Sequence, residues 1–253
     1  MKKLFLVLLA SFLSFQVLAN PIDDNCPGHV IHGAPVSKIE SNNQYICHLN
    51  YAVHYRYDTK TAEYVVEHLD KADITGPAKR KDDFRPDPLV EDTKEAQLDD
   101  YKGVPYDRGH LVPAADNRAD DKQMSESFFL TNMVPQDPGH NRGIWRILEV
   151  GVRNTAVNND IYVVSGTIYH PGYPTIGKNK VGIPSELWKV IYNASTGESI
   201  GFLFPNTKLS TKDLPKYAVS VSDIEKATGL TFFPELPDAV KDKYNLKNWP
   251  EIK

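Results

Sequence analysis

The sequence predicts an α+β domain built mainly on an antiparallel sheet, and three observations support this fold class. Residues 45–69 and 185–206 each contain two strand-like runs that flank a short polar turn. Helical patterns occur at scattered positions, near residues 141–154 and 222–229. Strands and helices do not alternate regularly, which argues against a parallel sheet. The length suits one domain with flanking helices and long loops.

The first 19 residues have the features of a secretory signal peptide. Lys2 and Lys3 precede an apolar run, and the run ends at small residues that suit cleavage after Ala19. The run is too short for a membrane span, and no later segment has roughly 18 consecutive apolar residues. We therefore expect residues 1–19 to be a signal peptide. The mature protein would be exported, periplasmic or extracellular, and would not contact the membrane.

The two cysteines of the chain, Cys26 and Cys47, lie close to the predicted mature N-terminus. In an exported protein such a pair predicts a disulfide, here one that ties an N-terminal extension, residues 20–44, to the first strand. Closing this loop would stabilise the fold by about 3 kcal/mol in the chain-entropy model. The alternative is a metal site with nearby histidines, but the spacing is not a usual zinc pattern. Those histidines are His29, His32 and His48.

Residues 45–102 predict a hairpin followed by a long loop. Residues 45–69 alternate polar and apolar side chains around the turn sequence DTKT, which indicates two long strands. Residues 75–102 are polar and contain prolines, and loops of this length in compact domains are often functional. The loop carries the densest basic cluster of the chain, which consists of Lys79, Arg80, Lys81 and Arg85.

The remaining elements follow in chain order. Residues 127–136 have the composition of a short strand, and residues 141–154 predict a helix that begins after Pro138 and Gly139. Residues 160–169 are apolar and β-branched, as in a central strand, and residues 185–206 predict a second hairpin. Near the C-terminus a short helix is predicted, with Ser222 and Glu225 as a capping box and Gly229 as its end.

The helix predicted from Asn141 has one charged face and one apolar face. At 100° per residue, the charged sector contains Arg142, Arg146, Glu149 and Arg153, and the opposite sector contains Ile144, Ile147 and Leu148. An amphipathic surface helix is the plainer interpretation of this pattern. However, polar side chains that solubility does not require precede the helix, namely Asn132, Gln136, His140 and Asn141.

The segment YDRGHLVPAAD, residues 106–116, supplies groups that suit phosphate chemistry. Arg108 is a cation for a phosphate oxygen, the glycine after it allows close backbone approach, and His110 is an imidazole that can accept a proton. A lone histidine is more often structural than catalytic. Hydrolysis of a phosphodiester also needs a hard cation, and magnesium prefers oxygen ligands such as those of Asn141 and Glu149.

These motifs together resemble the DNA/RNA non-specific endonucleases of the ββα-metal (His-Me finger) group, and in particular their exported bacterial members. The resemblance covers residues 45–236 and implies that residues 45–253 form a single nuclease domain of the ββα-metal fold. It rests on an ordered set of segments: DFRPDP, YDRGHLVPAAD, TNMVPQDPGHNRGIWRILE and ATGLTFFPEL.

Residue by residue, the resemblance implies that His110 is the general base that activates water. Asn141 would be the direct protein ligand of a magnesium ion, and Glu149 would contact the ion through water. Arg108 would contact the phosphate or orient water, and Asp107 would brace the turn. The resemblance also implies supporting or substrate-binding roles for Asn132, Gln136, Arg153 and one arginine of the upstream loop, either Arg85 or Arg80.

The expected function is that of an exported endonuclease that depends on Mg²⁺, with Mn²⁺ as a substitute, and hydrolyses DNA and RNA to products with 5′-phosphates. Low specificity follows if the protein contacts phosphates, because such contacts do not distinguish bases. Without Lys2 and Lys3 the chain has 27 basic and 33 acidic residues, a net charge of −6. Basic side chains must therefore gather at the site for DNA and RNA to bind.

Two other functions remain open at this point. A catalytically silent nuclease fold that only binds nucleic acid would have lost the histidine, asparagine or glutamate, and all three are present. A metal-dependent phosphodiesterase for small substrates would share the same residue types, and the relative cleavage of long DNA and of bis-nitrophenyl phosphate would separate the two. The sequence does not predict the oligomeric state.

Overall fold

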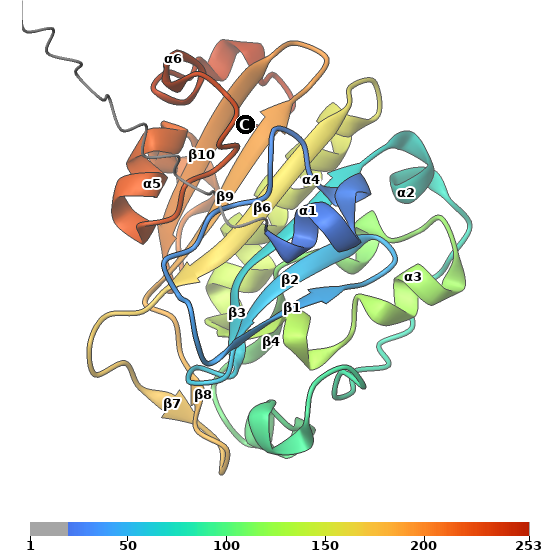
Figure 1. The fold of residues 1–253 in the computed structure, drawn as a ribbon, viewed down its shortest axis with the longest axis vertical. Coiled ribbons are helices and arrows are strands. Elements are labelled where there is room, and N and C mark those ends of the chain that lie inside the picture. The colour runs from blue at the N-terminus through green and yellow to red at the C-terminus, as the bar shows by residue number, and fades with distance from the viewer. Residues whose placement is uncertain (1–19, 253) are drawn as a thin grey trace, which may run out of the picture.

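The computed structural model describes residues 20–252 and is built around a seven-stranded sheet (Figure 1). The predicted signal peptide lies outside these residues. Within them, no helix is both long and apolar enough to cross a membrane. The α+β class predicted from the sequence is confirmed, with helices on both faces of a sheet whose neighbouring strands are all antiparallel.

The central sheet explains most of the strand patterns in the sequence. In spatial order its strands are β1 (Asn43–Cys47), β2 (Tyr51–Arg56), β3 (Thr61–Leu69), β6 (Ile161–Ile168), β9 (Glu186–Asn193), β10 (Glu198–Pro205) and β11 (Ala218–Val219). The predicted central strand is β6, which pairs with β3 and β9, and the second predicted hairpin is β9–β10. Both predictions are confirmed.

The other elements surround this sheet. Two small sheets consist of β4 (Asp107–His110) with β5 (Met133–Gln136) and of β7 (Thr175–Ile176) with β8 (Val181–Gly182). The α-helices are α1 (Pro21–Asn25), α2 (Lys71–Thr75), α3 (Asp121–Glu126), α4 (Arg146–Ala156), α5 (Val221–Thr228) and α6 (Asp238–Lys241). Shorter helical turns are η1 (Pro27–His29), η2 (Asp92–Lys94), η3 (Leu98–Tyr101), η4 (Ala114–Asp116), η5 (Leu130–Asn132), η6 (His140–Trp145), η7 (Thr211–Tyr217) and η8 (Leu246–Asn248).

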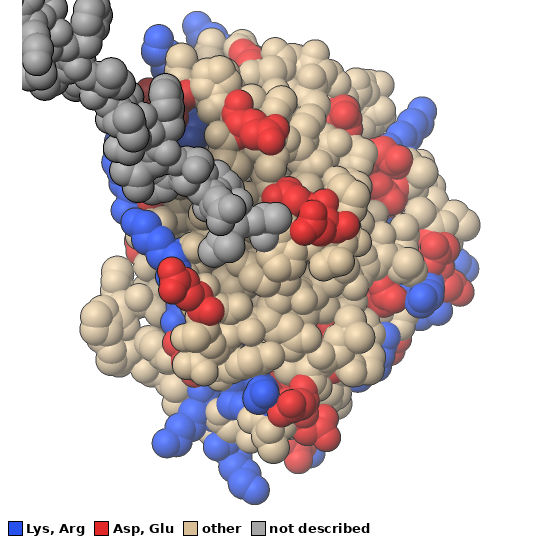
Figure 2. Space-filling model, in the orientation of Figure 1, with Lys and Arg blue, Asp and Glu red and all other residues tan. Residues whose placement is uncertain are grey.

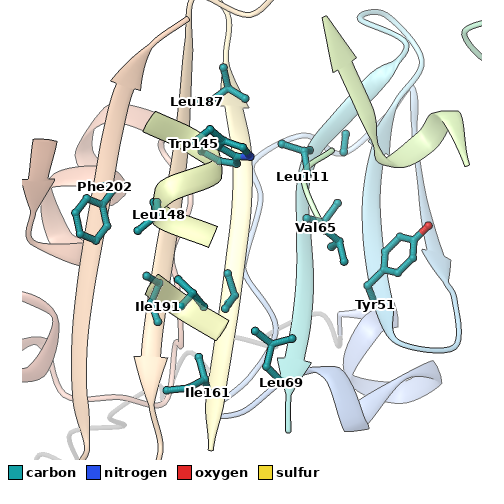
Figure 3. Packing of buried hydrophobic residues seen from close by; sticks show 14 of the residues in the cluster. Tyr51, Val65, Leu69, Leu111, Trp145, Leu148, Ile161, Leu187, Ile191 and Phe202 are labelled. Carbon is teal, nitrogen blue, oxygen red and sulfur yellow. The ribbon is translucent and has the colours of Figure 1, made fainter. Parts of the chain in front are cut away.

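The sheet separates two apolar clusters, because successive side chains of a strand point to opposite faces. On one face, Val65, Leu187 and Ile191 pack with Trp145 and Leu148, which lie on or next to α4 (Figure 3). The other face is covered by the N-terminal segment and α5, which lie on the viewer's side in Figure 1. Helix α4 is therefore anchored to the sheet by its apolar side, and its charged side is left for the site described below.

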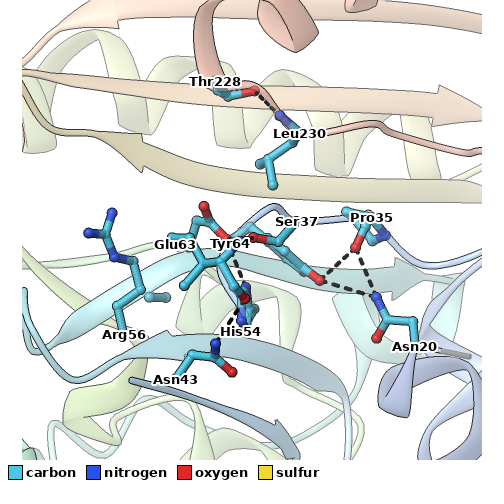
Figure 4. Close-up of polar contacts among 12 residues, drawn as sticks. Asn20, Pro35, Ser37, Asn43, His54, Arg56, Glu63, Tyr64, Thr228 and Leu230 are labelled. Atoms are coloured by element: carbon cyan, nitrogen blue, oxygen red, sulfur yellow. Dashed lines mark hydrogen bonds and ion pairs between the residues drawn. The ribbon is translucent and has the colours of Figure 1, made fainter. Parts of the chain in front are cut away.

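The N-terminal segment is fixed to the sheet by covalent and polar contacts. The predicted disulfide joins Cys26 and Cys47 with an S–S distance of 2.07 Å, so neither cysteine is available for the alternative metal site. Asn20 and Tyr64 both donate hydrogen bonds to the carbonyl oxygen of Pro35, at 2.9 and 2.8 Å (Figure 4). Residues 20–44 are thus part of the packed structure.

The first predicted hairpin differs from the structure in one respect. Its turn lies at the expected position between β2 and β3, but the first long strand is divided into two antiparallel strands, β1 and β2. The chain reverses at residues 48–50, where the His48 backbone N–H donates to the Tyr51 carbonyl at 2.8 Å. Asn50 also donates to the Asp116 carbonyl at 3.1 Å. The alternation of polar and apolar residues in 45–56 does not encode this distant contact, so the division into two strands was not predicted.

The predicted capping box of the C-terminal helix is wrong by two positions. The N-cap of α5 is Ser220, whose hydroxyl accepts a hydrogen bond from the Asp223 backbone N–H at 3.1 Å. Ser222 instead donates to Asp242, and Glu225 accepts from the Phe232 N–H. Because both side chains form these tertiary hydrogen bonds, they do not form the predicted capping box. The helix does end at Gly229, as predicted, with φ at +76°.

Candidate active site

A hairpin and a helix form the framework of the candidate site. Strands β4 and β5 pair so that His110 lies opposite Met133, and the chain then passes through η6 into α4. The predicted helix start at Asn141 lies in a kinked helical turn, in which Gly143 has non-helical backbone angles, φ −103° and ψ −110°. Regular α-helix begins at Arg146.

The side chains of this framework line one open cavity of about 330 Å³. Its polar and charged lining residues are Arg80, Arg108, His110, Asn141, Arg142, Arg146, Glu149 and Arg153. Five of these residues are arginines and one is acidic. The cavity is therefore locally basic in a chain whose net charge is −4, and the predicted gathering of basic side chains at the site is observed.

His110 is held in a largely apolar environment. Its ring makes edge-to-face contacts with Phe84 and Phe128, at centroid distances of 5.6 and 5.0 Å. The indole of Trp145 donates a hydrogen bond to the His110 carbonyl at 3.2 Å. Burial, with the nearby positive charges of Arg80 and Arg108, lowers the pKa of the imidazole to about 3. The ring is consequently neutral near pH 7, the form that can accept a proton.

Asn141 has a defined orientation because Asp107 binds its amide nitrogen. The Asn141 Nδ2 donates to Asp107 Oδ2 at 2.9 Å, and Arg142 donates twice to the same carboxylate, at 2.8 and 2.6 Å. Although burial opposes it, these hydrogen bonds lower the pKa of Asp107. Since Nδ2 is engaged, Oδ1 is the atom of Asn141 that is left for a ligand in the cavity.

Glu149, on α4, lines the same cavity. Burial raises the pKa of its carboxyl group to about 7, and the positive charges of Lys189 and Arg153 act in the opposite direction. Arg153 donates to Asp116 at 2.6 Å, which fixes its guanidinium at the edge of the cavity. A bound cation near Glu149 would favour the charged carboxylate.

The oxygen atoms in the cavity fit a magnesium ion. Asn141 and Glu149 line the same cavity, and an amide oxygen and a carboxylate are both ligand types that Mg²⁺ accepts while it keeps several waters. Over residues 20–252 no group of three or more His, Cys, Asp or Glu side chains could hold a metal. A protein cage for a transition metal is therefore not formed by the described residues, and water or substrate oxygens would complete the coordination.

A buried lysine beneath the cavity was not found by sequence analysis. The Lys189 Nζ donates to Ser165 Oγ at 2.5 Å and to the Leu111 carbonyl at 3.4 Å, and lies 4.9 Å from the Trp145 ring centre. Lys189 and Trp145 thus hold the adjacent carbonyl groups of Leu111 and His110. The available signal was a lysine at an inward position of β9, between the core residues Leu187 and Ile191.

Some predicted residues lie outside the cavity lining. Asn132 is buried and exchanges two hydrogen bonds of 2.9 Å with the Val112 backbone, so it supports the chain that follows His110. Gln136 is also buried and lies against Gly109, where any Cβ atom would approach its side chain within 2.3 Å. The close approach that requires this glycine is therefore to Gln136.

The two candidates for the upstream arginine are separated by the structure. Arg85 donates to Asp83 and to the Ser125 carbonyl, and its guanidinium lies 4.2 Å from the Phe129 ring centre, away from the cavity lining. Arg80 lines the cavity. The structure thus brings Arg80, and not Arg85, together with His110.

A β-hairpin that carries the histidine, followed by a helix that carries asparagine and glutamate, defines the ββα-metal class of nucleases. The family model described as DNA/RNA non-specific endonuclease matches residues 32–239. The chain belongs to this family of nucleases. The match begins at residue 32, within the segment that the sequence interpretation treated as an extension.

Similar proteins agree with this assignment. Human mitochondrial nuclease EXOG is 35% identical over 233 residues, which cover 85% of this chain and 62% of EXOG. Human mitochondrial endonuclease G is 33% identical, over 74% of this chain and 68% of that protein. A nuclease from Nostoc sp. is 29% identical, over 88% and 89%. The chain spans about three fifths of the length of the EXOG relatives.

The fold is also similar to a solved structure. Endonuclease G, in the crystal structure of its complex with the inhibitor EndoGI, superimposes with a TM-score of 0.74 at 26% identity. The superposition covers 83% of this chain and 91% of that chain. The predicted ββα-metal fold is thereby confirmed.

Proposed function

We propose that this protein is a magnesium-dependent endonuclease that hydrolyses phosphodiester bonds of both DNA and RNA. The observation that carries the proposal is one cavity that is lined by a neutral His110, by Asn141 and Glu149, and by five arginines. Family membership supports the reaction class. The arginines suit phosphates, and because phosphate contacts do not distinguish bases or sugars, we expect low specificity.

In this proposal His110 removes a proton from the attacking water. A pKa of about 3 makes the free imidazole a weak base, but a bound phosphate would place negative charge in the cavity and raise it. Mg²⁺, or Mn²⁺ as a substitute, would be held by Asn141 directly and by Glu149 through water, and would stabilise charge on the leaving oxygen. Arg108 and Arg153 neutralise the phosphate, and products would carry 5′-phosphates.

We also propose that the protein is exported to the periplasm or the extracellular medium. The composition of residues 1–19 supports this, as does the disulfide between Cys26 and Cys47, because disulfides persist mainly in oxidising compartments. Nucleic acid is the proposed partner.

Digestion of plasmid DNA and of RNA tests the proposed function directly. The mature wild-type protein should cut both substrates with Mg²⁺ and neither with EDTA, whereas His110→Ala should lose at least the 10²- to 10⁴-fold contribution typical of a general base. His170→Ala is the matched control, because that side chain is 69% exposed and outside the cavity. Cleavage by His110→Ala at the wild-type rate would remove the central assignment. If the wild type binds DNA without cutting it, the protein is a binding module.

A further inference from the structure

A second cavity lies directly beside the candidate active site. It has a volume of about 250 Å³ and is lined by Leu98, Tyr101, Lys102, Tyr106, Asp107 and Arg108. Arg108 lines both cavities. Asp107 connects them as well, since its carboxylate accepts hydrogen bonds from Asn141 and Arg142 on the wall of the first cavity. A ligand that occupies the active site can therefore extend into the second cavity past Arg108.

The lining of the second cavity combines two tyrosines and a leucine with three charged residues. Tyr106 is half-buried, Leu98 is 38% exposed, and Tyr101 lies buried behind them. The Arg108 guanidinium lies 4.2 Å from the Phe84 ring centre, so it is held in place at the boundary. Lys102 is highly exposed and pairs with Asp99 only at the surface. Arg142 neutralises Asp107, which reduces repulsion of an anionic ligand.

This combination suits one nucleotide of a polynucleotide. Bases of any sequence stack on aromatic side chains, and neighbouring cations bind the backbone phosphates. The active-site cavity has many arginines but, among its lining residues, no aromatic ring other than that of His110. The lining of the second cavity adds the aromatic residue Tyr106, a residue type that the first lining lacks.

We propose that the second cavity is a base-binding subsite for a nucleotide next to the scissile phosphate. The base packs against Tyr106 and Leu98, Arg108 contacts the phosphate between the subsite and the reaction centre, and Lys102 contacts the phosphate on the far side. The proposal rests on the proposed function and deepens it. Because stacking is independent of base identity, the subsite requires a base without selecting one.

An abasic residue in a defined oligonucleotide provides the test. A short oligothymidylate with one central abasic residue is digested with Mg²⁺, and mass spectrometry of the products gives the cleavage rate at every linkage. Each linkage corresponds to one register of the strand in the site. In the register that would place the abasic residue in the subsite, wild-type cleavage should be slower than in the intact oligothymidylate, by roughly 5- to 100-fold if one stacking interaction is lost.

Tyr106→Ala should abolish this position-specific difference and lower kcat/KM on the intact oligothymidylate by a similar factor. Leu98→Ser should reduce the same difference. Because Leu98 is exposed and lies outside the buried clusters, this variant tests the subsite even if Tyr106→Ala fails to fold. Tyr244→Ala is the matched control, because Tyr244 is 40% exposed and lines neither cavity.

The outcomes separate the two proposals. If wild-type protein cuts the intact oligonucleotide but shows no slowed linkage next to the abasic residue, the subsite is refuted and the nuclease function stands. A slowed linkage that persists in both Tyr106→Ala and Leu98→Ser would place base binding elsewhere and also refute the subsite. If the wild type cuts neither oligonucleotide with Mg²⁺, the proposed function itself has failed.

Discussion

At the scale of single residues, Asp107 determines which atom of Asn141 faces the cavity. Its carboxylate binds Asn141 Nδ2 and also holds Arg142. We predict that Asp107→Ala lowers the apparent Mg²⁺ affinity by about 10- to 100-fold, the usual cost of losing a residue that orients a metal ligand. Asp107→Asn retains an acceptor and should lie between this variant and wild type.

Cleavage rates as a function of Mg²⁺ concentration measure this effect. High Mg²⁺ should restore part of the Asp107→Ala activity, because the change affects binding of the ion more than the chemistry. Asp213→Ala, which removes a partly exposed carboxylate paired with Lys216 outside the cavity lining, is the control and should match wild type. An unchanged Mg²⁺ dependence in Asp107→Ala would show that Asn141 does not require this orientation.

Glu95 gives a second prediction at this scale, for stability. Its carboxyl group is buried and accepts two hydrogen bonds from the Asp87 backbone N–H, at 2.8 and 2.9 Å. Burial, with the negative charges of Asp87 and Asp92, raises the pKa of Glu95 from 4.5 to about 8. Between these values the folded state binds more protons than the unfolded state, so the Glu95 contribution to stability decreases as pH rises.

Glu95→Gln should remove this pH dependence. Between pH 4.5 and 8, the difference in unfolding free energy between variant and wild type should shift in favour of the variant, by up to about 1.4 kcal/mol per pH unit. Urea denaturation of both proteins across this range, without metal, measures it, and the exposed Glu235→Gln serves as control. Parallel stability curves for Glu95→Gln and wild type would contradict the raised pKa.

The cavity residues that were predicted from the sequence all lie in local sequence motifs. His110 lies on β4, Asn141 on η6 and Glu149 on α4. Each belongs to a continuous sequence motif, and the conformation of each motif depends mainly on residues close together in the chain. The choice between Arg80 and Arg85 depended on the path of a long loop, and Lys189 depended on the face of a strand in the middle of the sheet. Such positions follow from tertiary packing, which local patterns do not encode.

At the scale of elements, the end of α5 tests how a helix stop works. Gly229 has φ +76°, and an added Cβ would meet only Lys38 Nζ, at 3.9 Å. Gly229→Ala should therefore destabilise the protein by about 1–2 kcal/mol through backbone conformation and not through collision. Gly28→Ala is the matched control, because Gly28 lacks a positive φ and has no atom within 4 Å of its Cβ position.

Thermal or urea unfolding of the two alanine variants measures this prediction. Equal stability of Gly229→Ala and Gly28→Ala would mean that the left-handed conformation is not maintained. The stop signal at Gly229 was predictable because it is a local backbone property. The start of the helix was not predictable, because Ser222 and Glu225 make contacts to Asp242 and Phe232 that compete with capping. The division of β1 from β2 depends in the same way on a distant contact, between Asn50 and residue 116.

At the scale of the whole molecule, the charge is distributed unevenly. The chain carries a net charge of −4, and the face that the N-terminal segment covers shows acidic and neutral surface near its centre, with basic side chains mainly at its periphery (Figure 2). Five arginines nevertheless line one cavity. Nucleic acid should therefore bind through this cavity and not through the general charge of the protein.

Salt dependence of binding tests that view. In the His110→Ala background, which prevents cleavage, the plot of log Kobs for duplex DNA against log salt concentration should have a slope of up to about −4.5 if five arginines contact phosphates. Arg146→Ala should make this slope less negative by about 0.9, because one phosphate contact is lost. Lys226→Ala, which removes an exposed cation on α5 paired with Asp223, should leave the slope unchanged. Equal effects of Arg146→Ala and Lys226→Ala would mean that diffuse surface charge, and not the cavity, binds the backbone.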